Sequence, residues 1–256
     1  MKFSIITVCW NSEKVLPKAM ASLAEQSFKD YEWVVIDGGS SDETLKIVNT
    51  FHAAPVNLLS EPDKGIYDAM NKGANLAQGE FLFFLNSDDA LHDANVLEDV
   101  SHWIEKNPDT DLIFGDVIYL KSDGRWLRDY DHVSKRNILE HGICHQGIFS
   151  RRQLFSSVGK FNLHFKLNAD YDWIIRVFRA SWRCVYMKRR LAFFADGGAS
   201  SIDKEYLAIE RKAVRLQYVG KYELAIRIFL ARIYNRLYWI IYGHPIGATH
   251  LDKVPQ

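Results

Sequence analysis

The stretch Phe81 to Asp89, FLFFLNSDD, decides the fold, because five apolar residues run directly into four polar ones. An apolar run that ends in a polar cluster is typical of a strand buried on both faces of a sheet. Its carboxyl end carries Asp88 and Asp89 to the rim, where open α/β sheets bind their ligands. Carboxylates there suit Mg²⁺ or Mn²⁺ held between the protein and a substrate diphosphate. The alternative is that both residues only cap a helix beginning near Ala90.

The segments before this stretch alternate between strand and helix patterns. Strands are expected over 3–10, 32–36 and 56–59, and helices over 12–27, 43–51 and 66–77. Such alternation predicts an α/β fold with βαβ crossovers and a parallel sheet. Asp37 and Asp63 follow the second and third strands, as Asp88 follows the fourth. Because the carboxyl ends of parallel strands share one edge, we expect the three carboxylates to face a common crevice.

The pattern is weaker after Asp89. We expect helices over 95–105, 170–180 and 204–243, strands over 111–119, 184–187 and 191–194, and an antiparallel return over 125–130. Asp170 and Asp172 lie near a helix start and project in different directions, so only one can serve an active site. We choose Asp170, which lies beside the preceding loop. His145, next to Gln146 in an apolar stretch, is interpreted as a core histidine rather than a catalyst.

Composition and missing motifs exclude several classes of protein. The 32 basic and 32 acidic residues balance, so whole-chain charge gives no argument for nucleic-acid binding. The three cysteines form neither a disulfide framework nor a zinc pattern, which suits a reducing cytosol. We expect no signal peptide and no membrane-spanning helix, which would need about 18 apolar residues in a row. A G-x-G-x-x-G turn and a P-loop are both missing from the sequence.

Five segments together resemble family 2 glycosyltransferases of the GT-A fold, in particular bacterial enzymes that assemble exopolysaccharides such as colanic acid. They are SIITVCWNSE at 4–13, VVIDGGSSDET at 34–44, EPDKGIYDAMNKGANLAQGEFLFFLNSDD at 61–89, HQGIFSRR at 145–152 and NADYDWIIRV at 168–177. Each segment is weak alone, but their order and spacing make the whole specific. The resemblance implies an open, mainly parallel GT-A sheet flanked by helices.

The resemblance implies a nucleotide site at the first strand ends. Thr7 and Asn11 would line this site beside Asp37, which is similar to the family's uridine-binding Asp. Asp63 is similar to a second Asp that contacts the base or the ribose. The nucleotide-sugar donor would therefore lie across the ends of the first three strands.

The resemblance also implies where the reaction occurs. Asn86-Ser87-Asp88 stands in the place of the family's D-x-D motif, with Asp88 holding Mg²⁺ or Mn²⁺ and Asn86 beside the donor sugar. Asp170 falls where the family carries its proposed general base. The implied activity is an inverting transfer from a nucleoside-diphosphate sugar, especially a UDP-sugar, to a hydroxyl group. The acceptor would be a growing glycan or a lipid-linked molecule in bacterial surface polysaccharide synthesis.

Two departures from the family pattern keep other functions open. Asn86 replaces the first acid of D-x-D, which favours a non-catalytic scaffold that binds sugar or nucleotide. The helix after Asp63 has Ala69-Met70-Asn71 where many members have A-R-N, so Lys64 or Lys72 would have to replace that Arg. The enzymatic rival is a sugar nucleotidylyltransferase, but that class needs a glycine- and arginine-rich loop where this chain has CWNSEK.

The tail is expected to form a helical extension over 201–256, after a catalytic domain over 1–200. Between Arg211 and Arg236, seven basic residues stand against one acid. Apolar residues recur on one face of a helix over 221–242, with interfacial aromatics beside them. Such a helix is typical of a segment on an anionic membrane surface, here the inner face of the cytoplasmic membrane. The alternative is that its apolar face packs on the catalytic domain or on a partner subunit.

Overall fold

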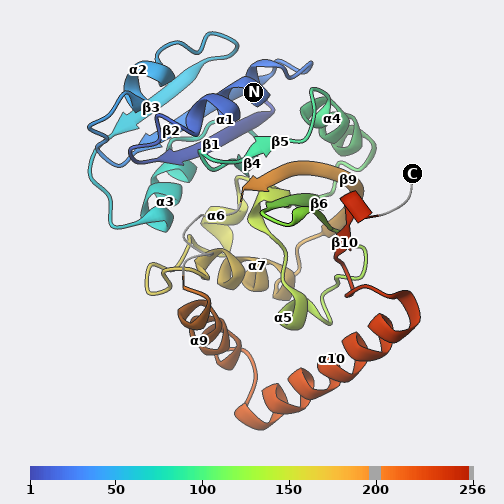
Figure 1. Cartoon of the computed structure of the whole chain (residues 1–256). Coiled ribbons are helices and arrows are strands. Elements are labelled where there is room, and N and C mark those ends of the chain that lie inside the picture. The colour runs from blue at the N-terminus through green and yellow to red at the C-terminus, as the bar shows by residue number, and fades with distance from the viewer. Residues whose placement is uncertain (196–202, 254–256) are drawn as a thin grey trace.

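Figure 1 shows the chain as a computed structural model that describes residues 1–195 and 203–253. The expected domain boundary at residue 200 lies outside these residues. Within them, no helix combines the length and the apolar character needed to cross a membrane. The first elements are β1 (Phe3–Cys9), α1 (Leu16–Ala24), β2 (Tyr31–Asp37), α2 (Thr44–Val48), β3 (Val56–Ser60), α3 (Ile66–Leu76) and β4 (Phe81–Phe84).

The first four strands form a parallel sheet in the order β3-β2-β1-β4. Cys9 pairs with Asp37, and Asp37 pairs with Ser60, so these strands end at one edge. This confirms the predicted parallel sheet. The helix α1 begins later than expected, because the side chain of Ser12 bonds Trp10 and Ser87 in the loop instead of capping a helix.

The sheet continues beyond β4 with antiparallel neighbours. These elements are β5 (Ala90–Leu91), α4 (Val96–Lys106), β6 (Leu112–Lys121), β7 (Gly124–Arg128), α5 (Ile138–His141), the 3₁₀ turn η1 (His145–Gly147), β8 (Ile148–Arg151), α6 (Leu154–Ser157), α7 (Ala169–Arg179) and β9 (Cys184–Ala195). β8 lies between β4 and β6, and β7 returns antiparallel to β6 as predicted. The two strands expected over 184–194 are the single strand β9, which pairs with β5 and β6.

The strand β5 overturns the capping alternative for Asp88 and Asp89. Ala90 and Leu91 pair with β9, and the next helix does not begin until Val96. The two carboxylates therefore belong to a loop between strands and cap no helix.

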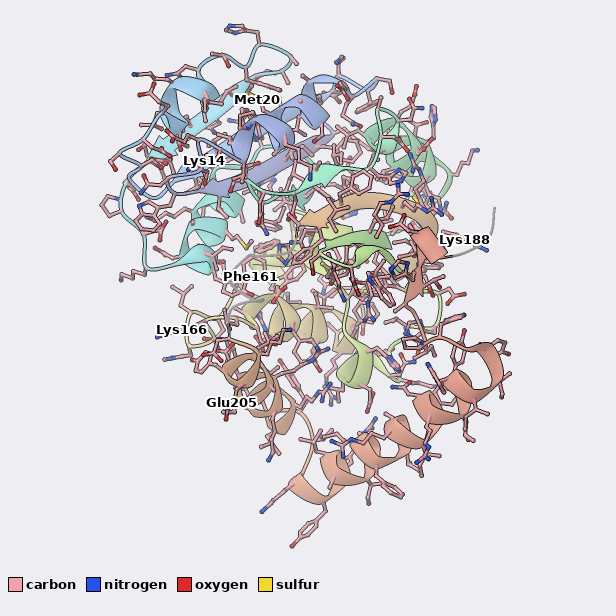
Figure 2. All side chains as sticks on the ribbon, viewed as in Figure 1. Lys14, Met20, Phe161, Lys166, Lys188 and Glu205 are labelled. Atoms are coloured by element: carbon pink, nitrogen blue, oxygen red, sulfur yellow. The ribbon has the colours of Figure 1, made fainter. Side chains whose placement is uncertain are left out.

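Apolar residues fill both faces of the sheet. Residues of α3, α6 and α7 pack on one face, and residues of α1, α2 and α4 pack on the other. Gly73 lets α3 lie close to β1, because a Cβ there would come within 2.4 Å of the side chain of Ile6. Figure 2 shows Phe161 in the interior, whereas Glu205, near the start of α9 (Lys204–Leu216), points outward.

The C-terminal region contains α9 (Lys204–Leu216), α10 (Lys221–Tyr242), β10 (Thr249–His250) and the 3₁₀ turn η2 (Leu251–Lys253). The single expected helix is thus two helices separated at Gly220. The helix α9 docks on the body, since the buried carboxylate of Glu210 accepts hydrogen bonds from the backbone N–H groups of Lys166 and Leu167. After α10, β10 joins the sheet beside β7.

Most apolar side chains of the helix α10 are exposed to solvent, and Figure 1 shows this helix at the edge of the molecule. Only Leu224 is buried. Phe229, Ile240 and Ile241 are 63%, 65% and 70% exposed. The alternative that this face packs on the catalytic domain is therefore wrong for the described part of the chain.

Candidate active site

The loops after β1, β2 and β4 meet at the carboxyl edge of the sheet. The hydroxyl of Ser12 donates to Ser87 Oγ over 3.2 Å. The backbone N–H of Ser12 donates to Thr44 Oγ1 over 2.8 Å. These contacts join the loop after β1 to those after β2 and β4. The edge is therefore a connected surface on which the predicted nucleotide-binding residues can act together.

Asp37 organises the loop after β2. Its Oδ2 accepts hydrogen bonds from the N–H groups of Gly39 and Ser40 and from the hydroxyl of Ser60. Burial raises the pKa of this carboxyl, but the hydrogen bonds from Ser40, Ser60 and Gly39 outweigh it and hold the pKa below its usual value. Since the chain itself engages both oxygens, direct contact with uridine stays a prediction.

Thr7 does not line the site, which corrects its predicted role. Its side chain is fully buried, and its Oγ1 accepts a hydrogen bond from the Trp33 indole over 2.9 Å. Successive side chains of a strand point to opposite faces of the sheet. The next residue, Val8, therefore points the other way, and it lines a pocket that opens beside this edge of the sheet.

Asn11 and Asp63 border the loop after β2. Asn11 Oδ1 accepts from the N–H of Ser41 over 2.9 Å. Asp63 lies over Gly38, where a Cβ would approach its Oδ2 to 2.8 Å. Trp10, which is 68% exposed, also borders Gly38 and offers a flat apolar surface beside both residues. An exposed indole is suited to stacking against a planar base.

The two lysines proposed to replace the missing Arg differ in their surroundings. Lys64 is exposed, and its backbone N–H donates to Asp68 over 3.0 Å. Lys72 forms an ion pair with Glu61 over 2.8 Å. Neither side chain lines the pocket of about 970 Å³ that opens beside this edge of the sheet.

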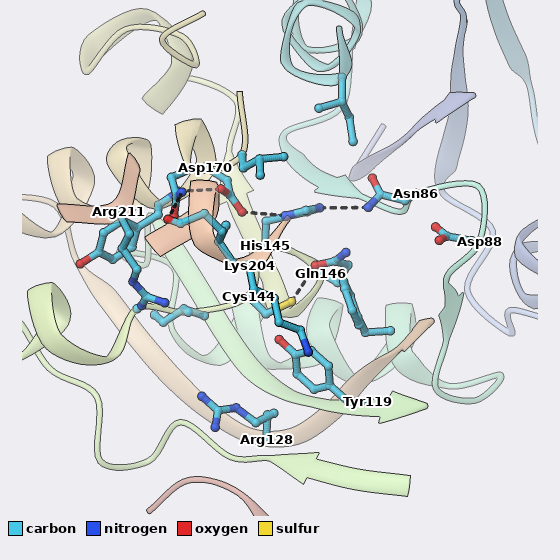
Figure 3. Close-up of a pocket in the computed structure, with 18 of the residues that line it drawn as sticks. Asn86, Asp88, Tyr119, Arg128, Cys144, His145, Gln146, Asp170, Lys204 and Arg211 are labelled. Atoms are coloured by element: carbon cyan, nitrogen blue, oxygen red, sulfur yellow. Dashed lines mark hydrogen bonds and ion pairs between the residues drawn. The ribbon is translucent and has the colours of Figure 1, made fainter. Parts of the chain in front are cut away.

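A pocket of about 970 Å³ opens beside this edge, and Asn86, Asp88 and Asp170 all line it. Figure 3 shows Asn86 and Asp88 on one side, with Asp170 across from them. His145 bridges the two sides, because its Nδ1 lies 2.9 Å from Asp170 Oδ2 and its Nε2 lies 3.4 Å from Asn86 Nδ2. The structure thus brings together three of the residues predicted from sequence.

Asp170 is held by three donors. Its Oδ1 accepts from the hydroxyl of Tyr67 over 2.7 Å and from the N–H of Tyr171 over 2.8 Å, while Oδ2 faces His145. Burial acts to raise the pKa of Asp170, but the contacts with His145 and Tyr67 outweigh it and lower the pKa. Asp172, the alternative, is buried away from the pocket and bonds Arg176.

Asp88 and Asp89 have different environments. Both oxygens of Asp89 are bonded, to Gln146 Nε2 and to the N–H of Ala195, and burial with the charge of Asp88 raises its pKa to about 6. The carboxylate of Asp88 faces the pocket and accepts no hydrogen bond from another described residue; burial raises its pKa also. The buried Oδ1 of Asn86 has no hydrogen-bond partner in the part of the chain that the structure describes. Unpaired oxygens of this kind fit a hard divalent cation at Asp88 and a polar sugar at Asn86.

The pocket also has basic side chains in its lining. Arg128, Lys204 and Arg211 line it, as Figure 3 shows. Arg211 donates to the carbonyl of His141 over 2.8 Å and lies over the ring of Tyr171. The pocket therefore carries basic side chains from β7 and α9 in addition to its carboxylates.

Among the described residues, one group of three has the spacing of a metal site: Asp129, Asp131 and His132. It follows β7 and does not line the pocket. Clusters like this are common at protein surfaces without an ion, so we assign it no role.

Sequence reasoning missed His145 and Tyr67. The interpretation of His145 as a core histidine is wrong, since its side chain lines the pocket and is 16% exposed. The available signal was a His-Gln pair that interrupts an apolar run. Tyr67 gave no signal, because its contact with Asp170 joins positions 103 residues apart.

A mainly parallel sheet covered by helices, with polar groups at the carboxyl edge and a pocket beside it, is typical of the GT-A class of fold. A family model described as glycosyl transferase family 2 matches residues 4–181. The chain belongs to this family and is a glycosyltransferase, as the sequence predicted.

Two curated relatives illustrate the family membership. A PGL/p-HBAD biosynthesis glycosyltransferase of Mycobacterium tuberculosis is 41% identical over 214 residues, which cover 80% of this chain and 82% of that protein. Glycosyltransferase AglE of Haloferax volcanii is 26% identical over 265 residues, covering 94% of this chain and 80% of that protein.

Solved structures support the fold. Residues 1–349 of S. aureus TarS, in complex with UDP-GlcNAc, give a TM-score of 0.69 at 21% identity and cover 92% of this chain and 72% of that one. A mannosyltransferase from Pyrobaculum calidifontis, in complex with GDP-Man and Mn²⁺, gives a TM-score of 0.62 at 18% identity, covering 88% and 64%. This chain spans 43% of a longer TarS structure. At these identities the likeness establishes the fold alone.

Proposed function

We propose that this glycosyltransferase moves a sugar from a nucleoside-diphosphate sugar, preferentially a UDP-sugar, to a hydroxyl group, with inversion at the anomeric carbon. One observation carries the proposal: Asp88 and Asp170 face the same pocket from separate elements. The bound nucleotide sugars of the TarS and mannosyltransferase structures support a donor of this class. The acceptor is a growing glycan or a lipid-linked molecule in bacterial surface polysaccharide synthesis.

The division of the pocket suits a single displacement. Negative charge accumulates on the departing nucleoside diphosphate, and Mg²⁺ or Mn²⁺ held by Asp88 would neutralise it. The anomeric carbon gains oxocarbenium character in the transition state. A base on the opposite side must take the proton of the attacking hydroxyl, and Asp170 with His145 supplies that function. Attack from the side opposite the leaving group inverts the anomeric configuration.

The test is the identity of the released product. The parent protein is incubated with a panel of UDP- and GDP-sugars, Mn²⁺ and a lipid extract that contains lipid-linked acceptors. Release of nucleoside diphosphate supports glycosyl transfer, whereas pyrophosphate would identify a nucleotidylyltransferase. Binding of nucleotide sugar without turnover would favour the scaffold, to which Asn86 in place of an acid points.

We also propose that α10 lies on an anionic membrane surface, which would locate the protein at the inner face of the cytoplasmic membrane. Apolar residues such as Phe229 and Ile240 are exposed, and Arg232 and Arg236 on the same helix are exposed as well. Apolar surface beside exposed positive charge is complementary to anionic lipid. Contact with the membrane would bring the active site close to a lipid-linked acceptor.

A further inference from the structure

The first observation concerns the carboxylate of Asp170. Its Oδ1 already accepts two hydrogen bonds, from Tyr67 and Tyr171, and its Oδ2 accepts one from His145. Its side chain is only 17% exposed. The same contacts lower its pKa against the effect of burial, which makes Asp170 a weak base. Asp170 is therefore poorly suited to take a proton directly from a sugar hydroxyl.

The second observation concerns the ring of His145. An ionised carboxylate only accepts hydrogen bonds, so the nitrogen facing Asp170, Nδ1, carries the proton. In the neutral ring Nε2 then presents a lone pair. This atom lies 3.4 Å from Asn86 Nδ2, on the pocket side of the ring. A base oriented by a carboxylate behind it is the arrangement used by many enzymes to activate a hydroxyl group.

We propose that Nε2 of His145 takes the proton from the acceptor hydroxyl, and that Asp170 is a positioning residue acting through Nδ1. The inference rests on the proposed glycosyl transfer. The hydroxyl proton moves to Nε2 as the oxygen forms its bond to the anomeric carbon. The bond from that carbon to the phosphate oxygen breaks, and its electron pair leaves with the nucleoside diphosphate. The imidazolium stays bonded to Asp170 and later returns its proton to water.

The departure at Asn86 fits this role. A carboxylate at position 86 would lie beside Nε2 and hold a proton there, whereas the neutral amide leaves the lone pair available. The contact of 3.4 Å is long, so an acceptor hydroxyl can replace it. Three carboxylates interact with the charge of the ring, Asp170 on α7 and Asp88 and Asp89 after β4. The other ionisable groups that line the same pocket are Tyr67 on α3, Tyr119 on β6, Cys144 beside η1, and Lys204 and Arg211 on α9.

The test uses water as the acceptor, because the natural acceptor is not identified. Release of nucleoside diphosphate is measured with a panel of UDP- and GDP-sugars and Mn²⁺, and UDP affinity is measured by calorimetry. His145→Gln should lower the release rate by about 10²–10⁴-fold, with little change in UDP affinity. His102→Gln is the matched control, since His102 is exposed on α4 away from the pocket.

The outcomes separate the two proposals. If the parent releases no nucleoside diphosphate from any donor, either with water alone or with the lipid extract added, the proposed function fails and this inference fails with it. If the parent is active and His145→Gln retains its rate, only the inference is overturned. A rate loss in His145→Gln that His102→Gln does not show, with UDP affinity retained, supports it.

A pH–rate profile distinguishes positioning from direct catalysis by Asp170. Asp170→Asn should be slower, with an acid limb shifted to lower pH, because the imidazolium loses a neighbouring negative charge. Asn86→Asp should shift the same limb to higher pH for the opposite reason. If the limb vanishes in Asp170→Asn while His145→Gln stays active, Asp170 itself is the base.

Discussion

The loop after β2 buries its charged carboxylate and bonds it fully, whereas the helix α10 leaves its large apolar side chains exposed. Asp37 is fully buried, and the surrounding chain bonds both of its oxygens. On α10, Phe229 and Ile240 remain 63% and 65% exposed. A region that satisfies its own groups supplies a rigid platform, whereas a long exposed apolar face requires something outside the chain. Substitutions at Asp37 should therefore appear in stability, and substitutions on α10 should appear in association.

The largest effect is expected at Asp88, which lies in the loop after β4 and belongs to neither of these two regions. Asp88→Ala should lower sugar transfer at least about 100-fold, because the cation that neutralises the leaving diphosphate would lose its carboxylate. Chelation of divalent cations should do the same to the parent. The measurement is nucleoside diphosphate release at saturating donor. Asp109→Ala is a matched control, since Asp109 is 84% exposed. Full activity in excess chelator would remove the metal from the mechanism.

The next effect tests the exposed region. Phe229→Ser with Ile240→Ser should weaken sedimentation with anionic liposomes at least about tenfold, because two large apolar side chains no longer enter the interface. The melting temperature should not change. Leu163→Ser, at a position 48% exposed elsewhere on the surface, is the control.

The membrane proposal fails if the parent stays in the supernatant at low salt. Point variants are preferable to a truncation near Ala208, which would remove most of α9. That helix carries Glu210 and Arg211, which bond the loop before α7 and the segment before η1.

A smaller effect tests the buried region. Asp37→Asn puts an amide N–H against donors of the loop, and we expect a loss of about 1–3 kcal/mol in the free energy of unfolding at pH 7. The folded-state pKa of Asp37 is lowered, so its contribution is present above the usual carboxyl pKa and is lost as pH falls through the lowered value. Thermal melts of parent and variant from pH 2 to 7 should converge at the acid end. A difference in melting temperature between parent and variant that stays constant from pH 2 to 7 would contradict the lowered pKa of Asp37.

Residues whose role shows in the neighbouring sequence could be predicted, whereas residues whose partners lie far away along the chain could not. Asp88 could be found because a local apolar run ends close to it, and α10 because an amphipathic pattern covers 221–242, although the break at Gly220 was not predicted. Thr7 was misplaced because a strand buried on both faces has no alternation to show which face meets a pocket. His145 was misread because Asp170 lies 25 residues away, and only the folded chain brings the two together.

An effect of opposite sign is predicted at Asp116, a second buried carboxyl that contrasts with Asp37. Its Oδ1 accepts both of its hydrogen bonds, from Tyr130 N–H and the Tyr186 hydroxyl. Burial outweighs these bonds and raises its pKa from 3.8 to about 6. Because the folded-state pKa is the higher one, the carboxyl favours the fold at low pH and costs stability as pH rises through about 6.

Asp116→Asn keeps an oxygen for both donors and removes the charge. The variant should melt about 3–8 °C above the parent at pH 7, with the difference closing toward pH 4, where the parent carboxyl is neutral. Thermal melts of both proteins across this range are the measurement, and Asp109→Asn is the exposed control. Equal melting temperatures at pH 7 would mean that the cost of burying the charge of Asp116 is offset by some group other than Tyr130 and Tyr186. The contrast would then be lost, because the fold would compensate both buried carboxylates equally well.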